Sequence, residues 1–117
     1  MTQALATTKV AVYRGMTTNA IGDEVENNAA PVVGLEAVPA SLIEKSRNVQ
    51  DPASGTWRTI RYKVLRPINP HIDVRDGDRF RDLSTGVLHS VDVITRTPRT
   101  IAGAAVLRIE GTVHNVE

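Results

Sequence analysis

The 117-residue sequence contains no cysteine, which excludes disulfides, thiolate chemistry and cysteine-ligated metal sites. The absence of cysteine also fits a reducing cytoplasm. Only one Trp, two Tyr and one Phe are present, so the core must be mostly aliphatic, and stacking on single-stranded bases lacks a platform. The formal net charge is only +1, which argues against a dedicated nucleic-acid binder but leaves room for a local basic patch.

Long apolar runs are missing as well. No stretch approaches the roughly 20 apolar residues that span a bilayer, so no membrane segment is expected. The first fifteen residues show no basic segment followed by an apolar run, so no signal peptide is expected. The chain has no internal repeat and no low-complexity tract, and its length suits one domain, residues 1–117.

What the sequence does contain is alternation of apolar and polar residues, which predicts strands. The clearest case is WRTIRYKVLR, residues 57–66, where Ile60, Tyr62 and Val64 predict a buried face and the residues between them a cationic outer face. In the strand predicted at 35–47, Pro39 indicates a sheet edge. The remaining predicted strands are 8–14, a short one after Asp76-Gly77, 87–96 and 105–115. About six short strands separated by turns predict an all-β fold, a small barrel or sandwich.

Two segments without a sustained period predict long loops. Residues 15–35 hold three glycines, three asparagines and one proline, and residues 47–56 are dense in turn-forming pairs such as Asp51-Pro52 and Ser54-Gly55. Together with its flanking strands, the second loop predicts a hairpin with a long tip over residues 35–66. Loops of this length in a small domain are often functional.

The segment DVRDGDRFRDLSTGVLHSVDVI, residues 73–94, concentrates aspartates around one histidine and could hold a metal or an acid–base pair. Turn chemistry is the simpler explanation, because Asp76 precedes Gly77 where a tight turn needs both residue types. Asp78 and Phe80 are two apart in the following strand and so share one face. A calcium loop of the EF-hand type would end in a glutamate, which this segment lacks. We therefore interpret the segment as turns between strands.

Other patterns of catalysis or ligand binding are also absent. The sequence has no GxSxG, GxGxxG or GK[ST] motif, and its histidines, His71, His89 and His114, do not form HxH or HExxH. His89 lies among valines, which predicts a hydrogen-bonded, partly buried ring. No catalytic residue, metal ligand or cofactor site is expected, and the chain is not expected to be an enzyme. A hydrolase or metal enzyme would require His89 to converge with Asp78 and Asp92.

Basic residues lie along the strand predicted at 57–66 and in and around the short strand predicted after Gly77. Arg79 and Arg81 are two apart, so both are expected to point outward. One interpretation is an electrostatic surface for DNA or an acidic protein partner. The other is a solvated strand face with carboxylates as cross-strand neighbours. The residues concerned are Arg58, Arg61, Lys63, Arg66, Arg75, Arg79 and Arg81.

A family resemblance rests on the order of five segments: VAVYRGMTTNAIGDEV, VPASLIEKS, DPASGTWRTIRY, DVRDGDRFRDLSTGVLHSVDVITRTP and LRIEG. Their order and spacing, with Val38 where Ile is more usual before PAS, resemble the small head-completion proteins of long-tailed phages. These are the head-to-tail stopper or head-closure proteins, especially those of actinobacterial phages. The resemblance runs from about Lys9 to Gly111.

The resemblance implies a small β-barrel that forms a homo-oligomeric ring, a hexamer or dodecamer, in the neck of the virion. Such a ring sits below the portal and adaptor, holds the packaged double-stranded DNA without sequence specificity, and offers a docking surface to the tail terminator or tail tube. It implies no membrane partner and no cofactor. Members of this family project a long loop into the channel, and either 15–35 or 47–56 could do so here. The favoured loop is 47–56, at the tip of a hairpin, and the first loop would then meet a neighbouring subunit or the adaptor. The candidate channel residues are Arg47, Asn48, Val49, Gln50, Asp51, Pro52, Ala53, Ser54 and Gly55. The candidate interface residues are Asp23, Glu24, Glu26, Arg58, Arg61, Lys63, Arg79 and Arg81.

Two further functions remain open at the level of sequence. A tail-completion protein, similar to a tail terminator, would occupy the same part of the virion but join the tail first. A small nucleic-acid-binding barrel would use the basic face of residues 57–66, and its DNA affinity would fall steeply with salt.

Overall fold

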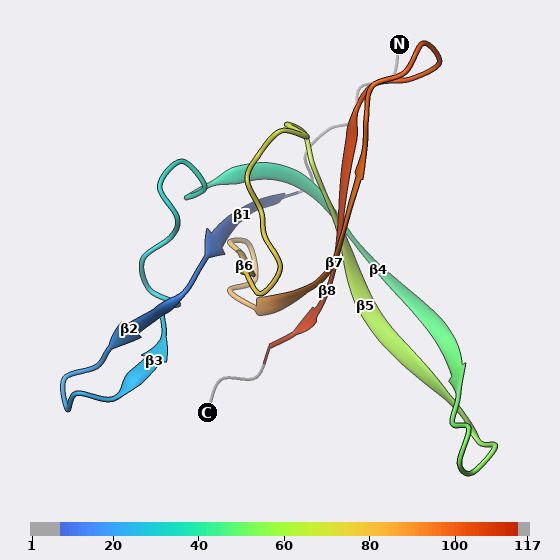
Figure 1. The fold of residues 1–117 in the computed structure, drawn as a ribbon, viewed down its shortest axis with the longest axis horizontal. Helices are drawn as coiled ribbons and strands as arrows, with labels where there is room; N and C mark the ends of the chain where they lie inside the picture. The colour runs from blue at the N-terminus through green and yellow to red at the C-terminus, as the bar shows by residue number, and fades with distance from the viewer. Residues whose placement is uncertain (1–7, 115–117) are drawn as a thin grey trace.

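The computed structural model describes residues 8–114, which form strands, turns and loops with no helix among them. Six antiparallel strands close a barrel in the order β1-β4-β5-β8-β7-β6, so the predicted all-β barrel is confirmed (Figure 1). The barrel strands are β1 (Thr8–Tyr13), β4 (Val38–Gln50), β5 (Trp57–Pro67), β6 (Arg79–Asp82), β7 (Leu88–Thr97) and β8 (Val106–Val113). The other two, β2 (Met16–Thr18) and β3 (Glu24–Glu26), pair only with each other. Within residues 8–114 no helix is long and apolar enough to cross a membrane.

The barrel is filled by aliphatic side chains around a single aromatic ring. Phe80 on β6 is fully buried and stacks on the imidazole of His89, with ring centroids 4.8 Å apart. Gly111 on β8 lets this ring approach, because a Cβ there would lie 2.8 Å from Phe80 Cε1. The buried core around Phe80 consists of Val10, Val12, Leu35, Val38, Ala40, Leu65, Val74, Val91, Leu107 and Ile109.

Three two-stranded arms leave the barrel (Figure 1). One is the β2–β3 hairpin, one is the distal part of β4 and β5, and one is the distal part of β7 and β8 with its turn at residues 98–105. The radius of gyration of 16.3 Å reflects them, because a compact chain of this length would have about 13 Å. The barrel holds the β4–β5 ribbon only at its root. There β1 pairs with residues 38–40 of β4, and β8 pairs with residues 63–65 of β5. Each strand of that arm is otherwise paired only with the other.

Both predicted long loops are shorter than expected. Residues 15–35 contain the β2–β3 hairpin, because Met16–Thr18 pairs with Glu24–Glu26 around a tight turn at residues 19–23. Residues 47–50 belong to β4, because they continue the ladder with residues 57–60. The true tip is residues 51–56, where Gly55 N donates to Asp51 O at 2.7 Å and Asp51 Oδ1 accepts from Ala53 N.

Closure of the barrel also overturns the edge prediction for Pro39. Residue 39 lies opposite Lys9 in the β1–β4 ladder, while β4 pairs with β5 from residue 40 onward. The missing N–H of proline is tolerated next to the point where the β5 ladder begins, and Pro39 O still accepts a hydrogen bond from Ile68 N.

Burial along β5 follows the predicted alternation. Val64 is 1% exposed and Ile60 and Tyr62 are half-buried, whereas Thr59 and Arg61 are exposed. Leu65 on the other face is also buried in the core, so both faces are covered where β5 lies in the barrel. On β7, a bulge between Val91 and Val93 breaks the alternation, and Val93 is exposed while Val91 is buried.

Candidate functional site

The aspartates of residues 73–94 lie at separate turns and interstrand contacts, and they do not gather at one site. Asp82 Oδ1 accepts from Thr8 Oγ1 at 2.6 Å and from the backbone and side chain of Ser84, and so fixes a turn. Asp92 accepts from Thr112 on the neighbouring strand. Within residues 8–114 no group of three or more His, Asp or Glu side chains could hold a metal ion. His89, Asp78 and Asp92 do not form a cluster, and this segment makes turns and anchors strands.

Asp78 forms the most buried ion pair of the described chain. Its side chain is only 2% exposed and accepts Nε and Nη2 of Arg14 at 2.8 and 2.7 Å. Arg75 N donates to the same carboxylate, which leaves it well satisfied. These hydrogen bonds raise the pKa of the Arg14 guanidinium above its usual value. The pair joins the end of β1 to the start of β6, where the barrel closes. No spacing pattern links two residues so far apart in the chain.

Arg79 and Glu26, both predicted interface residues, form hydrogen bonds and ion pairs within the subunit. Arg79 is buried, not solvent-exposed as predicted, because the chain before and after the β2–β3 hairpin covers it. It donates to Asn28 Oδ1 at 2.6 Å and to Gly15 O at 2.9 Å, and it pairs with Glu26 at 3.7 Å. Arg81 is half-buried and reaches Gly86 O, and its guanidinium lies 5.5 Å from the Tyr13 ring centroid. These contacts fix the base of the hairpin.

A chain of three polar side chains was not predicted from sequence. Ser90 Oγ lies 2.6 Å from His114 Nδ1, and His114 Nε2 lies 2.7 Å from Glu26 Oε1. The hydrogen bond from His114 is the main reason that the pKa of Glu26 lies below its usual range. The three residues come from β7, from just after β8 and from β3, so no local spacing could reveal them. The arrangement resembles a hydrolytic triad in residue types, but its geometry ties the hairpin to the barrel.

His89 differs from its prediction as a hydrogen-bonded residue. It is 2% exposed, and neither ring nitrogen has a hydrogen-bond partner. Burial is the main cause that lowers its pKa below 6.5, and the positive charge of Lys63 adds to this. The negative charge of Asp82 offsets part of this effect, and the nearby backbone of Val87 and Phe80 offsets a smaller part. The neutral ring therefore serves as a flat packing partner for Phe80.

Replacing His89 with leucine is expected to remove part of the acid sensitivity of the fold. The folded chain holds the proton on residue 89 less readily than the unfolded chain, so the contribution of neutral His89 is complete above about pH 6.5 and declines below it. When the pH is lowered from 7.5 to 5.5, the Tm of the His89→Leu variant should fall less than the Tm of the parent. Thermal melts at several pH values test this, and parallel curves for both proteins would contradict it.

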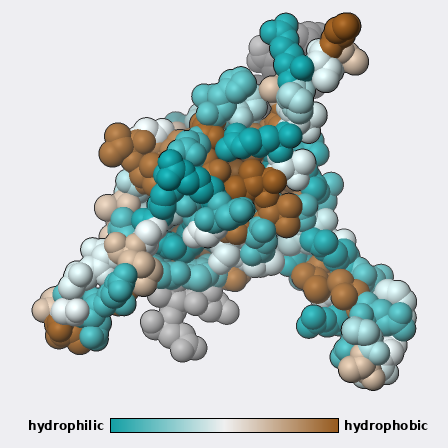
Figure 2. All heavy atoms as spheres, in the orientation of Figure 1, coloured by the Kyte–Doolittle hydropathy of each residue, from teal (hydrophilic) through white to brown (hydrophobic). Residues whose placement is uncertain are grey.

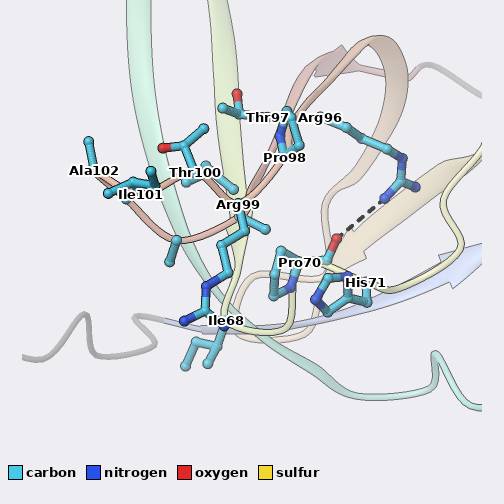
Figure 3. Close-up of a pocket in the computed structure, with 14 residues that line it drawn as sticks. Ile68, Pro70, His71, Arg96, Thr97, Pro98, Arg99, Thr100, Ile101 and Ala102 are labelled. Carbon is cyan, nitrogen blue, oxygen red and sulfur yellow. Dashed lines mark hydrogen bonds between the residues drawn. The ribbon is translucent and has the colours of Figure 1, made fainter.

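A groove of about 810 Å³ lies between residues 68–71 and the outer end of the β7–β8 arm, residues 96–106 (Figure 3). Arg96 spans its floor and donates to the carbonyls of Pro70, Ile72 and Val74 at 3.3, 3.0 and 3.2 Å. The lining is rich in proline, alanine and isoleucine, with His71 and Arg99 as further polar groups and no carboxylate. This composition suits an apolar segment better than a reacting substrate.

The remaining predicted site residues lie on the arms. Asp23 and Glu24 are exposed near the tip of the β2–β3 hairpin, and Arg58 and Arg61 are exposed on the β4–β5 arm; none of the four forms an ion pair with a described residue. Lys63 faces Glu44 at 3.9 Å. Arg47 is held by Glu110 at 3.0 Å and covers the ring of Tyr62, so it does not belong to a free loop.

The arms also expose apolar side chains. Figure 2 shows hydrophobic patches at the ends of the β2–β3 and β7–β8 arms and along the β4–β5 arm. Ile21 is 82% exposed, Trp57 67%, and Ile101 is fully exposed. Each of the three arms therefore carries a large apolar side chain that is mostly exposed.

No protein-family model and no curated protein matches this chain. Among solved structures, the chain is similar to the phage-like element PBSX protein xkdH from Bacillus subtilis. The TM-score is 0.48 and the sequence identity 10%, over 95% of this chain and 96% of that chain. A similarity of this size assigns neither a family nor a function.

Proposed function

We propose that this protein is a structural subunit of a bacteriophage neck, a head-to-tail stopper that forms a ring and retains the packaged genome. The observation that carries the proposal is the set of three arms around a small closed barrel. A two-stranded ribbon with both edges open is only marginally stable in water. Arms of this kind gain their order by packing against neighbours, as the subunits of a ring do.

The order and spacing of the segments from Lys9 to Gly111 supply the specific role. They resemble head-closure proteins of long-tailed phages, whose rings lie between the portal or adaptor and the tail. In this proposal the subunits assemble in the host cytoplasm into a hexameric or dodecameric ring of the virion. The adaptor binds one side, and the tail terminator or tail tube binds the other.

The tip of the β4–β5 arm is the proposed channel element. Its turn, residues 51–56, is closed by its own hydrogen bonds and projects at the end of a ribbon of eleven paired positions. A turn held in this way can stand in a channel without support from the barrel. The tip carries one acidic residue, Asp51, and no cation, so it would block DNA sterically rather than bind it.

The test is deletion of the gene from the phage that carries it, with electron microscopy and nuclease protection of the resulting heads. Tailless heads that package DNA and then lose it are expected. Full, stable heads beside free tails would instead indicate tail completion, and normal infectious virions would contradict a role in the neck.

Complementation with a shortened arm separates channel closure from ring assembly. Replacing residues 51–56 with Asn-Gly, which makes a two-residue hairpin turn, should permit rings and tails to form while DNA leaks. The matched control replaces residues 98–105 with the same dipeptide between the paired Thr97 and Val106. DNA retention with the shortened β4–β5 arm would exclude this tip as the plug.

A nucleic-acid-binding barrel is the second candidate, favoured by the exposed cations of the β4–β5 arm. Its DNA affinity would fall steeply between 50 and 200 mM salt, roughly in proportion to the number of phosphates contacted.

A further inference from the structure

Two of the arms carry opposite charge. The β2–β3 hairpin, residues 16–26, has three carboxylates and no cation. The β4–β5 arm, residues 44–63, has five cations and two carboxylates, a formal charge of +3. The two arms leave the barrel on opposite sides in Figure 1, so neither can neutralise the other within one subunit.

The contacts inside the subunit leave a defined set of charges unused. On the hairpin, Glu26 is held by His114 and Arg79, whereas Asp23 and Glu24 are exposed. On the β4–β5 arm, Arg47 and Lys63 have partners, whereas Lys45, Arg58 and Arg61 are exposed and form no ion pair with the described residues. The unused charges are therefore acidic on one arm and basic on the other.

Pairing register places two of the three unpaired cations, Lys45 and Arg58, on a face that also carries apolar side chains, while Arg61 lies on the opposite face. Lys45 lies opposite Tyr62 and Val49 lies opposite Arg58, so Lys45 and Arg58 share one face of the ribbon by alternation. The same face carries Ile43, which is 48% exposed, and half-buried Val49 and Ile60. The opposite face carries the paired Glu44 and Lys63, with Ser46, Arg61, Asn48 and Thr59.

The hairpin has a matching mixture of acid and apolar groups. Glu24 lies opposite Thr18, and Met16, two residues away, shares its face and is 52% exposed. Ile21 projects from the turn beside Asp23 with 82% of its surface exposed. Both arms thus combine charge with apolar area, which is the composition of a protein contact rather than of a purely solvated face.

We propose that the β2–β3 hairpin of one copy of this chain docks on the Lys45/Arg58 face of the β4–β5 arm of the next copy. Asp23 and Glu24 then face Lys45 and Arg58, and Met16 and Ile21 cover the apolar strip of Ile43, Val49 and Ile60. Because the two surfaces are different, the contact is head-to-tail and leaves one free arm of each kind at the ends of any open chain. Repetition closes a ring when the rotation between copies allows it.

This inference rests on the proposed function only for closure of the ring, since docking of one arm on another needs no virion. Charge complementarity sets the register and orientation, while the apolar strip supplies buried area. Reversing the charges on one arm should therefore weaken association more than replacing the same residues with neutral ones.

The experiment measures self-association of the full chain by sedimentation velocity and native mass spectrometry at 50 and 500 mM NaCl. The parent should form oligomers that weaken with salt. D23K/E24K and K45E/R58E should each weaken association at least tenfold, because each variant then has two arms of the same sign. A mixture of the two variants should recover association, since each junction again joins an acidic arm to a basic one. The quadruple variant D23K/E24K/K45E/R58E should recover it within one chain.

Charge reversals elsewhere provide the control. Glu36→Lys and Arg99→Glu change exposed residues outside both arms and should alter association less than threefold. A parent that stays monomeric at all concentrations, or variants whose mixture fails to recover association, would overturn the arm-to-arm contact. Oligomers that ignore all reversals would also overturn it but leave the neck proposal intact. Normal virions after gene deletion would overturn the neck proposal and leave the contact intact.

Discussion

Replacing Arg14 with methionine is expected to destabilise the protein by about 3 kcal/mol, because it leaves the Asp78 carboxylate buried without its charged partner. Asp78 is 2% exposed and keeps one donor among the described residues, the Arg75 N–H. Methionine preserves much of the aliphatic packing of the arginine stem, so the loss reports on the ion pair and on the hydrogen bond from Arg14 Nη2 to Asp73 O at 2.6 Å. Urea unfolding at pH 7 measures it.

A surface pair of the same residue types serves as the control. Arg75 contacts Asp73 at 2.7 Å, but both side chains are more than 60% exposed. Arg75→Met should therefore change the unfolding midpoint little. Arg14→Lys should fall between the two variants, since lysine keeps the charge but cannot donate two parallel hydrogen bonds. Equal losses for Arg14→Met and Arg75→Met would contradict the assigned role.

Substituting Gly111 with alanine is expected to cost about 2 kcal/mol and to lower Tm by roughly 8 °C. A Cβ at this position would lie 2.7 Å from Ser90 O and 2.8 Å from Phe80 Cε1. The first contact is with backbone, and the second is with a fully buried ring that is already stacked on His89. Neither neighbour can move without disturbing the ladder or the core.

Gly103→Ala is the matched control for this substitution. A Cβ at residue 103 meets nothing within 4 Å, and the residue lies in the turn of the β7–β8 arm. Its Tm should stay close to that of the parent in differential scanning calorimetry. A Gly111→Ala protein with an unchanged Tm would mean that the core around Phe80 has more space than the structure shows.

The fold could be predicted largely from strand alternation and turn residues. The predicted strands at 8–14, 57–66 and 87–96 lie within one residue of β1, β5 and β7, and Gly77 has the positive φ that its turn requires. The sequence pattern could not show that residues 47–50 continue β4 beyond the predicted strand end. They are extended because they pair with residues 57–60, and that pairing is not visible in residues 47–50 themselves. Alternation also predicted the burial along β5, where Val64 is buried and Arg61 is exposed.

The candidate site was less predictable because its contacts are distant in the chain. Arg14 reaches Asp78, Arg79 reaches Asn28, and His114 reaches Glu26, and no spacing rule links any of these pairs. Of the candidate interface residues, Asp23, Glu24, Arg58 and Arg61 are exposed. The sequence could not separate them from Glu26 and Arg79, whose side chains contact each other and the chain at the base of the hairpin.

The ladder between β1 and β6 has a consequence for how the chain folds. It joins residues 10–13 to residues 79–82, whereas the β4–β5 and β7–β8 ribbons each join neighbouring parts of the chain. Ribbons closed by short turns lose little entropy when they form, while the β1–β6 seam must wait for the intervening chain to collapse. We therefore expect closure of this long-range seam to be the slow step of folding, after the local turns of the ribbons have begun to pair.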